Sequence, residues 1–511
     1  MSADAATADF FRARLDHMID LRQPLVVLAS RMPWQQIEAS LAHLFSRKAH
    51  TGLAMPDLDL FGEAALPAAR QSNAGRPRIP LRTMIALLYL KHAFDLSDEA
   101  VVERWSDSPN MQYFSGMAYF EPRLPCDATT LIKFRRLLGE EGVEELLSQT
   151  ITAAVSLNLI PAAALATVVV DSTVQEKAVA HPTDSKLLET ARSKLVAAAQ
   201  DAGIELKQTF AKEGRLLRFK AGRYAHAKQF KRMRRVIKRQ STVVGRLVRE
   251  IERKASALQA LACEALGGAL DKAKRIAEQS KSRKNTTGRA KLYAWHAPEV
   301  ECIAKGKSRT PYEFGVKVGI AMTLKHNLIV GARAFPGKPY DGHTLREQLE
   351  QAGILMQETG VQPSTVYVDL GYRGVDADNP GIAIKHRGKF KTLSAQERKL
   401  LRRRQAVEPI IGHLKSDHRM DRCWLQGALG DALHSISCAA GYNLRWLMRA
   451  IVRLGISPAF LRLLQAVLSK RHAKELPYGA PGRPWIKRVN DSLGSGRVKK
   501  SNFGHTVQVA F

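Results

Sequence analysis

Two runs of aliphatic and β-branched residues, each leading into an aspartate, constrain the fold of this chain most. The first is Ala166–Thr173, which contains Asp171, and the second is Ser364–Tyr372, which contains Asp369. Continuous apolar runs of this length are typical of strands that helices cover on both faces. Ligand sites in such sheets form at the carboxyl ends of the strands. The sequence therefore predicts an α/β fold with two carboxylates at one sheet edge, although either aspartate alone could be a turn residue or a helix cap.

A third acid, Glu408, lies alone in the basic stretch Arg402–Lys415. In a helix, Arg404, Glu408 and Lys415 share one face, because residues three and four apart lie above one another. An ordinary helix with charge pairs between successive turns also fits this spacing. Pro409 removes a helical hydrogen bond, so we expect either a kink or a new helix with Glu408 as its cap.

Asp171, Asp369 and Glu408 together suit a site for a hard metal ion. Carboxylate oxygens are the ligands that Mg²⁺ and Mn²⁺ prefer. Two such ions about 3.5–4 Å apart can activate an attacking oxygen and stabilise the leaving one in phosphoryl transfer. The five cysteines make no CxxC pair, which argues against a disulfide framework or a structural zinc site; they are Cys126, Cys263, Cys302, Cys423 and Cys438.

The charge of the chain points to a polyanionic partner. Lys and Arg outnumber Asp and Glu by 31 over 511 residues. Such an excess attracts nucleic acid and releases its condensed counterions, which favours DNA or RNA over a membrane surface or the ribosome. The chain shows no apolar run long enough for a membrane span and no signal peptide at its start, so we expect a cytoplasmic protein.

The first part of the chain is predicted to be helical. Residues 1–75 show helical spacing without a distinctive motif, and residues 76–160 contain three short helices. The third of these begins with Asp127 as its cap and points Lys133, Arg135 and Arg136 outward. A basic third helix suits a helix-turn-helix-like DNA-binding domain, and a small bundle with a solvated basic face fits equally well.

Residues 183–300 interrupt the sheet domain with a basic insertion. Between residues 183 and 292 there are 28 Lys or Arg against 10 Asp or Glu. Apolar residues from Phe230 to Leu261 step by three and four, which predicts a long helix with Arg234, Arg235 and Lys238 on its outside. We expect a helical hairpin whose solvated face binds phosphates; a purely structural arm is the alternative.

The remaining segments complete a catalytic domain formed by residues 161–182 and 301–455. The pattern predicts a hairpin over residues 313–335 that turns at Lys325–Asn327, a strand at Gly381–His386 and a helix from Asp431 to about Val452. Residues 456–511 are expected to form a C-terminal helix and a mobile tail, because they become rich in Pro, Gly, Lys and Ser.

These features together resemble the DDE transposases of bacterial insertion sequences, in particular their insertion-sequence-five-like branch. Arg404, Glu408 and Lys415 match the last three positions of the family motif Tyr-x2-Arg-x3-Glu-x6-Lys, and Leu401 stands where the family has tyrosine. Other segments that match family motifs are Arg76–Ser148, Val168–Thr173, Pro339–Leu345, Val368–Gly374 and Gly427–His434. The resemblance covers most of residues 76–450.

The resemblance implies an RNase H-like mixed sheet flanked by helices, with Asp171 on the first strand, Asp369 just after the fourth and Glu408 on a later helix. It implies an enzyme that binds the terminal inverted repeats of its element, cuts DNA with water and joins the freed 3′-hydroxyl to target DNA. Two Mg²⁺ or Mn²⁺ ions would be held by the three carboxylates. Arg404, Lys415 and Arg373 would contact DNA.

Two other functions share some of these features. A metal-dependent nuclease on the same core would use the same carboxylates without joining ends, and a relic that only binds DNA would need none of them. Because two DNA ends must be held together, the resemblance also implies a homo-oligomer that forms on double-stranded DNA.

Overall fold

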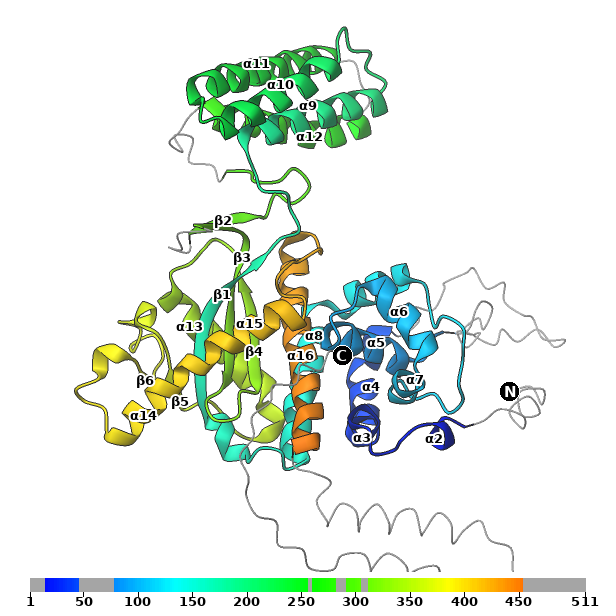
Figure 1. The fold of residues 1–511 in the computed structure, drawn as a ribbon, viewed down its shortest axis with the longest axis vertical. Coiled ribbons are helices and arrows are strands. Elements are labelled where there is room, and N and C mark those ends of the chain that lie inside the picture. The colour runs from blue at the N-terminus through cyan, green and yellow to red at the C-terminus, as the bar shows by residue number, and fades with distance from the viewer. Residues whose placement is uncertain (1–13, 46–77, 256–259, 282–290, 305–310, 454–511) are drawn as a thin grey trace, which may run out of the picture. The chain divides into compact units, whose positions relative to one another are not determined.

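The computed structural model describes residues 14–45, 78–255, 260–281, 291–304 and 311–453 (Figure 1). The predicted C-terminal segment 456–511 lies outside these residues. Within the part of the chain that the structure describes, no helix is both long and apolar enough to cross a membrane.

A six-stranded mixed sheet lies at the centre of the catalytic region. Its strands are β1 (Thr167–Glu176), β2 (Glu301–Ala304), β3 (Tyr312–Thr323), β4 (Ile329–Phe335), β5 (Thr365–Tyr367) and β6 (Ala383–Lys385). The order is β2-β3-β1-β5-β6, with β4 also paired to β3. β3 runs antiparallel to β1, β2 and β4, whereas β1, β5 and β6 are parallel. Val168, Val169 and Val170 are fully buried, which confirms the predicted covered strand.

The predicted hairpin is confirmed as β3 and β4. Asn327 adopts a left-handed backbone with φ of 59°, as a tight turn at this point requires. β6 also forms where a strand was predicted, but it is shorter than the Gly381–His386 segment.

Helices on both sides of the sheet and the N-terminal helices share one hydrophobic core. The sheet-covering helices are α13 (Asp341–Leu355) and α16 (Gly427–Arg453), and α16 begins before the predicted Asp431. Short 3₁₀ turns lie at His43–Phe45, Ala162–Ala166, Gln357–Thr359, Leu370–Tyr372 and Arg387–Lys389. Fold class is therefore as predicted: a mixed α/β sheet flanked by helices, with an N-terminal helical region.

The described N-terminal region is helical, as predicted. It contains α2 (Leu15–Met18), α3 (Pro24–Arg31), α4 (Trp34–Ala42), α5 (Leu81–Ala93), α6 (Asp98–Asp107), α7 (Pro109–Phe114) and α8 (Ala128–Ser156). Asp127 caps α8 by accepting from the Thr129 amide, as predicted. The third predicted helix is short, as expected, because the helical backbone is interrupted at Gly139, where φ is 63° and ψ is −168°; a second helical stretch then continues to Ser156.

The prediction that Arg135 points outward was wrong. Its side chain is only 3% exposed, and its Nη2 lies 2.5 Å from Asp98 Oδ1. A buried charge needs a partner of opposite sign, so Asp98 on α6 determines where this guanidinium lies. Lys133 and Arg136, on the same helix, are exposed as predicted.

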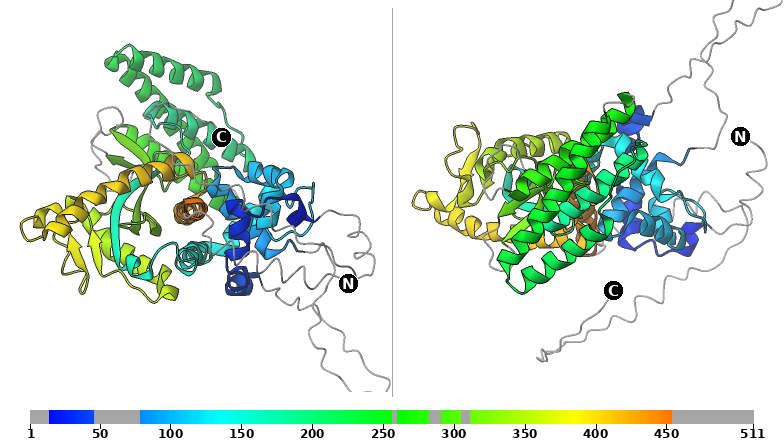
Figure 2. Two further views of the ribbon diagram at one scale, coloured as in Figure 1. Left: turned by 60° about the horizontal axis from the view of Figure 1, so that its bottom comes forward. Right: turned by 90° about the horizontal axis from the view of Figure 1, so that it is seen from above.

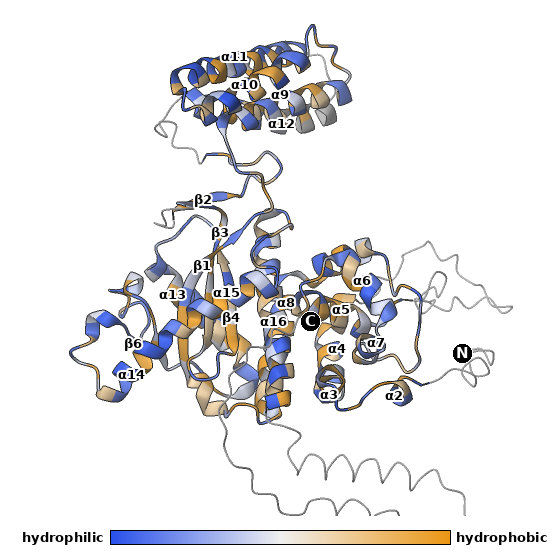
Figure 3. Ribbon diagram, viewed as in Figure 1, coloured by the Kyte–Doolittle hydropathy of each residue, from blue (hydrophilic) through white to orange (hydrophobic). Residues whose placement is uncertain are grey.

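The insertion between β1 and β2 is a four-helix bundle instead of the predicted hairpin (Figures 1 and 2). Its helices are α9 (Asp184–Asp201), α10 (Ala211–His226), α11 (Phe230–Ala255) and α12 (Ala260–Lys281), and they bury a core of their own. Val244, Leu247 and Ile251 face that core, as the spacing predicted. α9, α10 and α12 were missed; the buried face of α9 mixes leucines with the polar side chains of Glu189 and Arg192, which obscures its apolar pattern. Figure 3 shows hydrophilic and hydrophobic residues side by side on each of these helices.

A helix break separates Arg404 from Glu408. α14 (Ala395–Arg403) gives way to a 3₁₀ turn at Arg404–Ala406, and α15 (Val407–Asp417) follows. Pro409 lies in the first turn of α15, where no helical hydrogen bond is lost. A new helix therefore begins here, but its cap is Ala406 and Glu408 lies inside its first turn.

Candidate active site

The pairing of β1 with β5 brings Asp171 and Asp369 to neighbouring positions. The two strands are parallel, and Val169 lies opposite Tyr367. Asp171 and Asp369 are each two residues further along, so both lie at the same edge of the sheet. This edge is the one that the two apolar runs predicted.

Arg404 lies between the two aspartates. Its Nη1 is 3.2 Å from Asp171 Oδ2, and its Nη2 is 3.6 Å from Asp369 Oδ1. The arginine side chain is 11% exposed, whereas that of Asp369 is 54% exposed. The sequence predicted that Arg404 would contact a DNA phosphate; in this structure its guanidinium is the shared counter-ion of the two acids.

The environment of Asp171 disfavours its charge. Burial, followed by repulsion from Asp369 and Asp341, raises the pKa of Asp171, although the Ser172 amide and Arg404 act in the opposite direction. The Ser172 amide donates to Asp171 Oδ1 at 2.8 Å. Burial and the neighbouring acids thus favour either the neutral form of Asp171 or a further cation beside it.

A fourth acid, Asp341, belongs to the same group of side chains and was missed as a site residue. It is the first residue of α13, and its Oδ1 accepts from Ser172 Oγ at 2.9 Å. Lys317 Nζ donates to the same oxygen at 2.8 Å and to the Pro339 carbonyl at 2.8 Å. A lysine inside an apolar strand needs a counter-charge, and this was the signal in the sequence that could have identified the pair.

Glu408 is exposed in the first turn of α15. Val407, Ile410 and Leu414 form the buried face of this helix. Three or more His, Cys, Asp or Glu side chains could bind one metal ion if their ligand atoms all lay within 4.8 Å of one another. Among the described residues this holds for His92, His434 and Cys438. The Glu408 carboxylate is therefore not gathered that closely with those of Asp171 and Asp369.

The donor set still fits a hard divalent cation. Asp171 and Asp369 offer carboxylate oxygens around the position that a guanidinium cation now occupies, and α15 carries a third carboxylate. These are ligands of the type that Mg²⁺ and Mn²⁺ require.

The other predicted DNA-binding residues lie at the surface. Arg373, Lys133, Arg136, Arg234, Arg235 and Lys238 are exposed, and Lys415 is half-buried. Arg234 and Lys238 line a groove on the insertion together with Arg249 and Lys291. These positions are accessible to a polyanion, whereas buried Arg135 is not.

Two motif residues next to the site have local roles. Tyr372 is buried, and burial, followed by the charges of Asp341 and Asp171, raises the pKa of its hydroxyl. The ring of His343 packs edge-on against Tyr340 with centroids 5.5 Å apart.

Comparison with known proteins finds transposase families in two parts of the chain. Residues 13–137 match the family described as a transposase domain (DUF772), and residues 283–444 match the transposase DDE domain. A protein of Rhizobium meliloti, described as uncharacterized protein ORF8 in the nfe locus, is 40% identical over 222 residues. The match covers 43% of this chain and 95% of that protein. No solved structure matches the chain.

Proposed function

Because this chain belongs to the DDE transposases of insertion sequences, we propose that it binds the terminal inverted repeats of its own element, cuts the DNA there and joins the freed 3′-hydroxyl to target DNA. Asp171, Asp369 and Glu408 are the catalytic residues of this proposal. Its substrate is double-stranded DNA, and it acts as a homo-oligomer that holds two ends.

The observation that carries the proposal is the pair of aspartates at the ends of two parallel strands. Asp171 and Asp369 come from segments far apart in the sequence, yet one arginine contacts both. Two acids held this close to each other repel, which is unfavourable for folding unless a cation compensates them. Such an arrangement suits a site whose function needs concentrated negative charge.

DDE transposases normally use divalent metal ions, and the carboxylates of Asp171, Asp369 and Glu408 would hold two Mg²⁺ or Mn²⁺ ions here. When bound, such ions supply Lewis-acid activation of water and stabilisation of the leaving oxygen. Asp171, the most buried of the three, would be one of the residues that hold them.

Arg404 has a second role in this proposal. Once another cation offsets Asp171 and Asp369, its guanidinium is available for the DNA phosphate beside the scissile bond. Guanidinium groups bind phosphate oxygens in a bidentate manner, so Arg404 would orient the strand. Lys415 on α15 and Arg373 after β5 would add further phosphate contacts.

The exposed basic residues extend the DNA contact away from the active site. Lys133 and Arg136 lie on α8 of the N-terminal region, and Arg234, Arg235 and Lys238 lie on α11 of the insertion. Phosphate contacts of this kind position a protein on DNA without reading its sequence. Our proposal is that the insertion contacts DNA that flanks the cut. Because these contacts are to phosphates, the DNA affinity would fall as the salt concentration rises.

The test is cleavage of a labelled duplex that carries the terminal repeat of the element, with Mg²⁺ and with EDTA. Asp369→Asn keeps the shape of an exposed side chain and removes its charge, so we expect at least roughly a 10³-fold slower cut with unchanged DNA binding. Asp378→Asn, an exposed acid in the same stretch, is the matched control and should cut like wild type. Equal rates for wild type and Asp369→Asn would contradict the assignment.

A further inference from the structure

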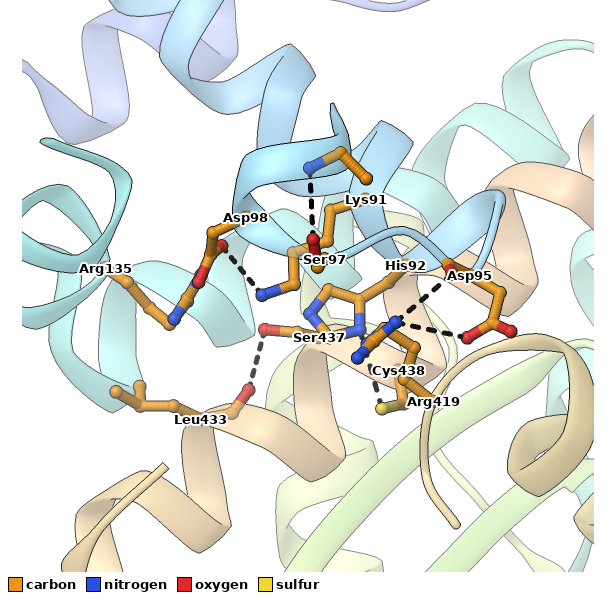
Figure 4. Close-up of polar contacts among 11 residues, drawn as sticks. Lys91, His92, Asp95, Ser97, Asp98, Arg135, Arg419, Leu433, Ser437 and Cys438 are labelled. Carbon is orange, nitrogen blue, oxygen red and sulfur yellow. Dashed lines mark hydrogen bonds and ion pairs between the residues drawn. The ribbon is translucent and has the colours of Figure 1, made fainter. Parts of the chain in front are cut away.

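The end of the Glu408 helix is anchored to the N-terminal region. α15 ends at Asp417, and the next residue, His418, donates its Nδ1–H to the His92 carbonyl at 2.8 Å. Arg419 Nη1 donates to the Asp95 carbonyl at 3.2 Å and lies 3.6 Å from Asp95 Oδ1. Figure 4 shows the Arg419 side chain reaching Asp95 just beyond the end of α5. The two residues that follow α15 therefore take partners from the N-terminal region, whereas Cys423, further along, pairs with the end of β1.

Both members of this contact have an unusual backbone. Asp95 has φ of 56° and Arg419 has φ of 69°, in the left-handed region that residues other than glycine rarely adopt. Such residues cost of order 1–3 kcal/mol each and persist only where their surroundings determine them. Two of them facing each other indicate that the position of this contact is closely specified.

α16 joins the same junction. His434 Nε2–H donates to the Arg419 carbonyl at 2.8 Å, and Cys438 Sγ lies 3.6 Å from His92 Nδ1. A Cβ at Gly441 would lie 2.5 Å from the His92 carbonyl carbon, so glycine is needed for the close approach of α16 to α5. The two helices therefore pack backbone to backbone at the point where the segment after α15 is held.

A buried ion-pair network fixes the end of α5 from the other side. Asp98 Oδ1 lies 2.7 Å from Lys91 Nζ and 2.5 Å from Arg135 Nη2. Burial raises the pKa of Asp98, but the two cations outweigh this and leave it lowered. Figure 4 shows Lys91 and Arg135 converging on this carboxylate. Since an uncompensated buried charge is costly, this network ties α5, α6 and α8 to one another.

The histidines and cysteine at the junction are better explained by hydrogen bonds than by a metal ion. His92, His434 and Cys438 have ligand atoms within 4.8 Å of one another, as a metal site would require. Burial, followed by the charges of Lys91 and Arg135, lowers the pKa of both histidines, so these two cations lie close to the ring nitrogens. A site next to several positive charges is a poor place for a divalent cation.

We propose that the N-terminal region positions the catalytic helix α15, with Arg419 and Asp95 as positioning residues for Glu408. This inference rests on the proposed function of Glu408. α15 has 11 residues and is therefore about 16 Å long, so a helix held at its carboxyl end and along its buried face has little freedom at Glu408. The N-terminal region would thus support catalysis as well as bind DNA.

The test uses Arg419→Gly, which removes the side chain and leaves a residue that adopts positive φ without strain. A displacement of about 1 Å can cost roughly 10²-fold in rate, so we expect cleavage of saturating terminal-repeat duplex to fall by 10- to 100-fold. The Mn²⁺ concentration for half-maximal cleavage should rise, while DNA affinity and the melting temperature stay close to wild type. Arg419→Lys should recover part of the rate. Arg422→Ala, an exposed arginine of the same loop, is the matched control.

A second measurement does not depend on activity. Hydrogen exchange of the α15 amides should become faster in Arg419→Gly and in Asp95→Asn, whereas the amides of β1 should keep their protection. Asp95→Asn also keeps a residue that tolerates left-handed backbone, so it serves if Arg419→Gly fails to fold. Unchanged exchange in α15 would overturn the proposal, as would equal loss of DNA binding and cleavage, which indicates a purely structural role. Stoichiometric zinc in the purified wild-type protein would overturn the hydrogen-bonded explanation of the junction.

These outcomes are distinguishable from failure of the proposed function. If wild type cuts no DNA with any divalent ion while α15 exchange still responds to Arg419→Gly, the junction anchors the helix but Glu408 is not catalytic, and the positioning proposal falls with that role.

Discussion

The sheet edge around Asp171 and the junction around His92 are both built from ionisable side chains, but their charges are opposite. At the edge, Asp171, Asp341 and Asp369 share Arg404 and Lys317, and Asp369 is 54% exposed. At the junction Lys91 and Arg135 share Asp98, whose side chain is 14% exposed, and Arg419 pairs separately with Asp95, whose side chain is 48% exposed.

The difference separates a site from a scaffold. An open group with surplus negative charge can accept a further cation, so its electrostatic repulsion serves binding. At the junction the enclosed acid is Asp98, which is already paired with two cations, so this group holds its helices together and leaves no buried carboxylate for a ligand. The net charge of an ionisable cluster and the exposure of its side chains therefore indicate whether it binds a ligand or holds the fold together.

The largest expected effect comes from removing charge at the edge. Asp171→Asn should slow cleavage by at least roughly 10³-fold, because it removes the most buried of the three carboxylates. It should leave the free energy of unfolding unchanged or increased, since the pKa of Asp171 is raised by burial and by neighbouring acids. Cleavage assays together with chemical unfolding measure both, and a clear loss of stability would show that Asp171 is structural.

Removing the buried acid of the junction should lower the free energy of unfolding. Asp98→Ala leaves Lys91 and Arg135 buried without a counter-charge, and breaking a buried pair in this way costs about 3–5 kcal/mol. Urea unfolding followed by circular dichroism would measure this loss. Asp107→Ala, at an exposed position of the same helix, should change stability by less than about 0.5 kcal/mol. Similar losses of unfolding free energy in Asp98→Ala and Asp107→Ala would contradict the structural role of the Asp98 network.

Acid should weaken the junction. Burial lowers the pKa of His418 to about 4 and that of His434 to about 3, against an ordinary value of 6.5. The charges of Arg445 and Arg449 contribute to the low pKa of His418, and those of Lys91, Arg135 and Arg419 to that of His434. The hydrogen bonds to the His92 and Arg419 carbonyls act in the opposite direction, as does Asp417 on His418.

The unfolded chain therefore binds more protons than the folded chain below pH 6.5. Each neutral histidine makes its full contribution to the free energy of unfolding above pH 6.5. That contribution is lost as the pH falls toward the pKa of the histidine in the folded chain, and the loss is about 2 kcal/mol per histidine at pH 5. Unfolding curves at pH 7.5 and pH 5 measure the sum. His434→Gln should show a smaller loss between these pH values, whereas His17→Gln, at an exposed position, should show the full loss.

The smallest effects are expected on the insertion. Neutralising Arg234, Arg235 and Lys238 to glutamine should leave cleavage of bound ends unchanged. It should reduce the slope of log K against log salt by about 0.9 for each DNA phosphate that the variant no longer neutralises. Titrations of flanked duplex at several salt concentrations would measure the slope. Lys254→Gln is the control, because this lysine is already paired with Glu250 at 3.0 Å; an equal change in slope would argue against specific contacts on α11.

The sequence predicted the features that depend on local pattern. The valines before Asp171 predicted a buried strand, and Pro409 predicted a break before the Glu408 helix. The position of the insertion between the first two long strands was also predicted, because the apolar spacing changes there from strand-like to helical.

Features that depend on partners distant in sequence were missed. Arg135 looked solvent-facing because its buried partner, Asp98, lies on another helix. Asp341 and Lys317 come from a helix and a strand that only the folded sheet brings together. The anchoring of Arg419 by Asp95 has no local signal, since neither residue is a glycine that would mark its left-handed backbone.

The central claim is that Asp171, Asp369 and Glu408 serve one site, although Glu408 is exposed and lies apart from the two aspartates. The most direct measurement is the cleavage rate of Glu408→Gln on saturating terminal-repeat duplex with Mg²⁺. The account predicts at least roughly a 10³-fold loss with unchanged DNA affinity. A rate equal to that of wild type would contradict it and would leave the two aspartates as a site without this helix.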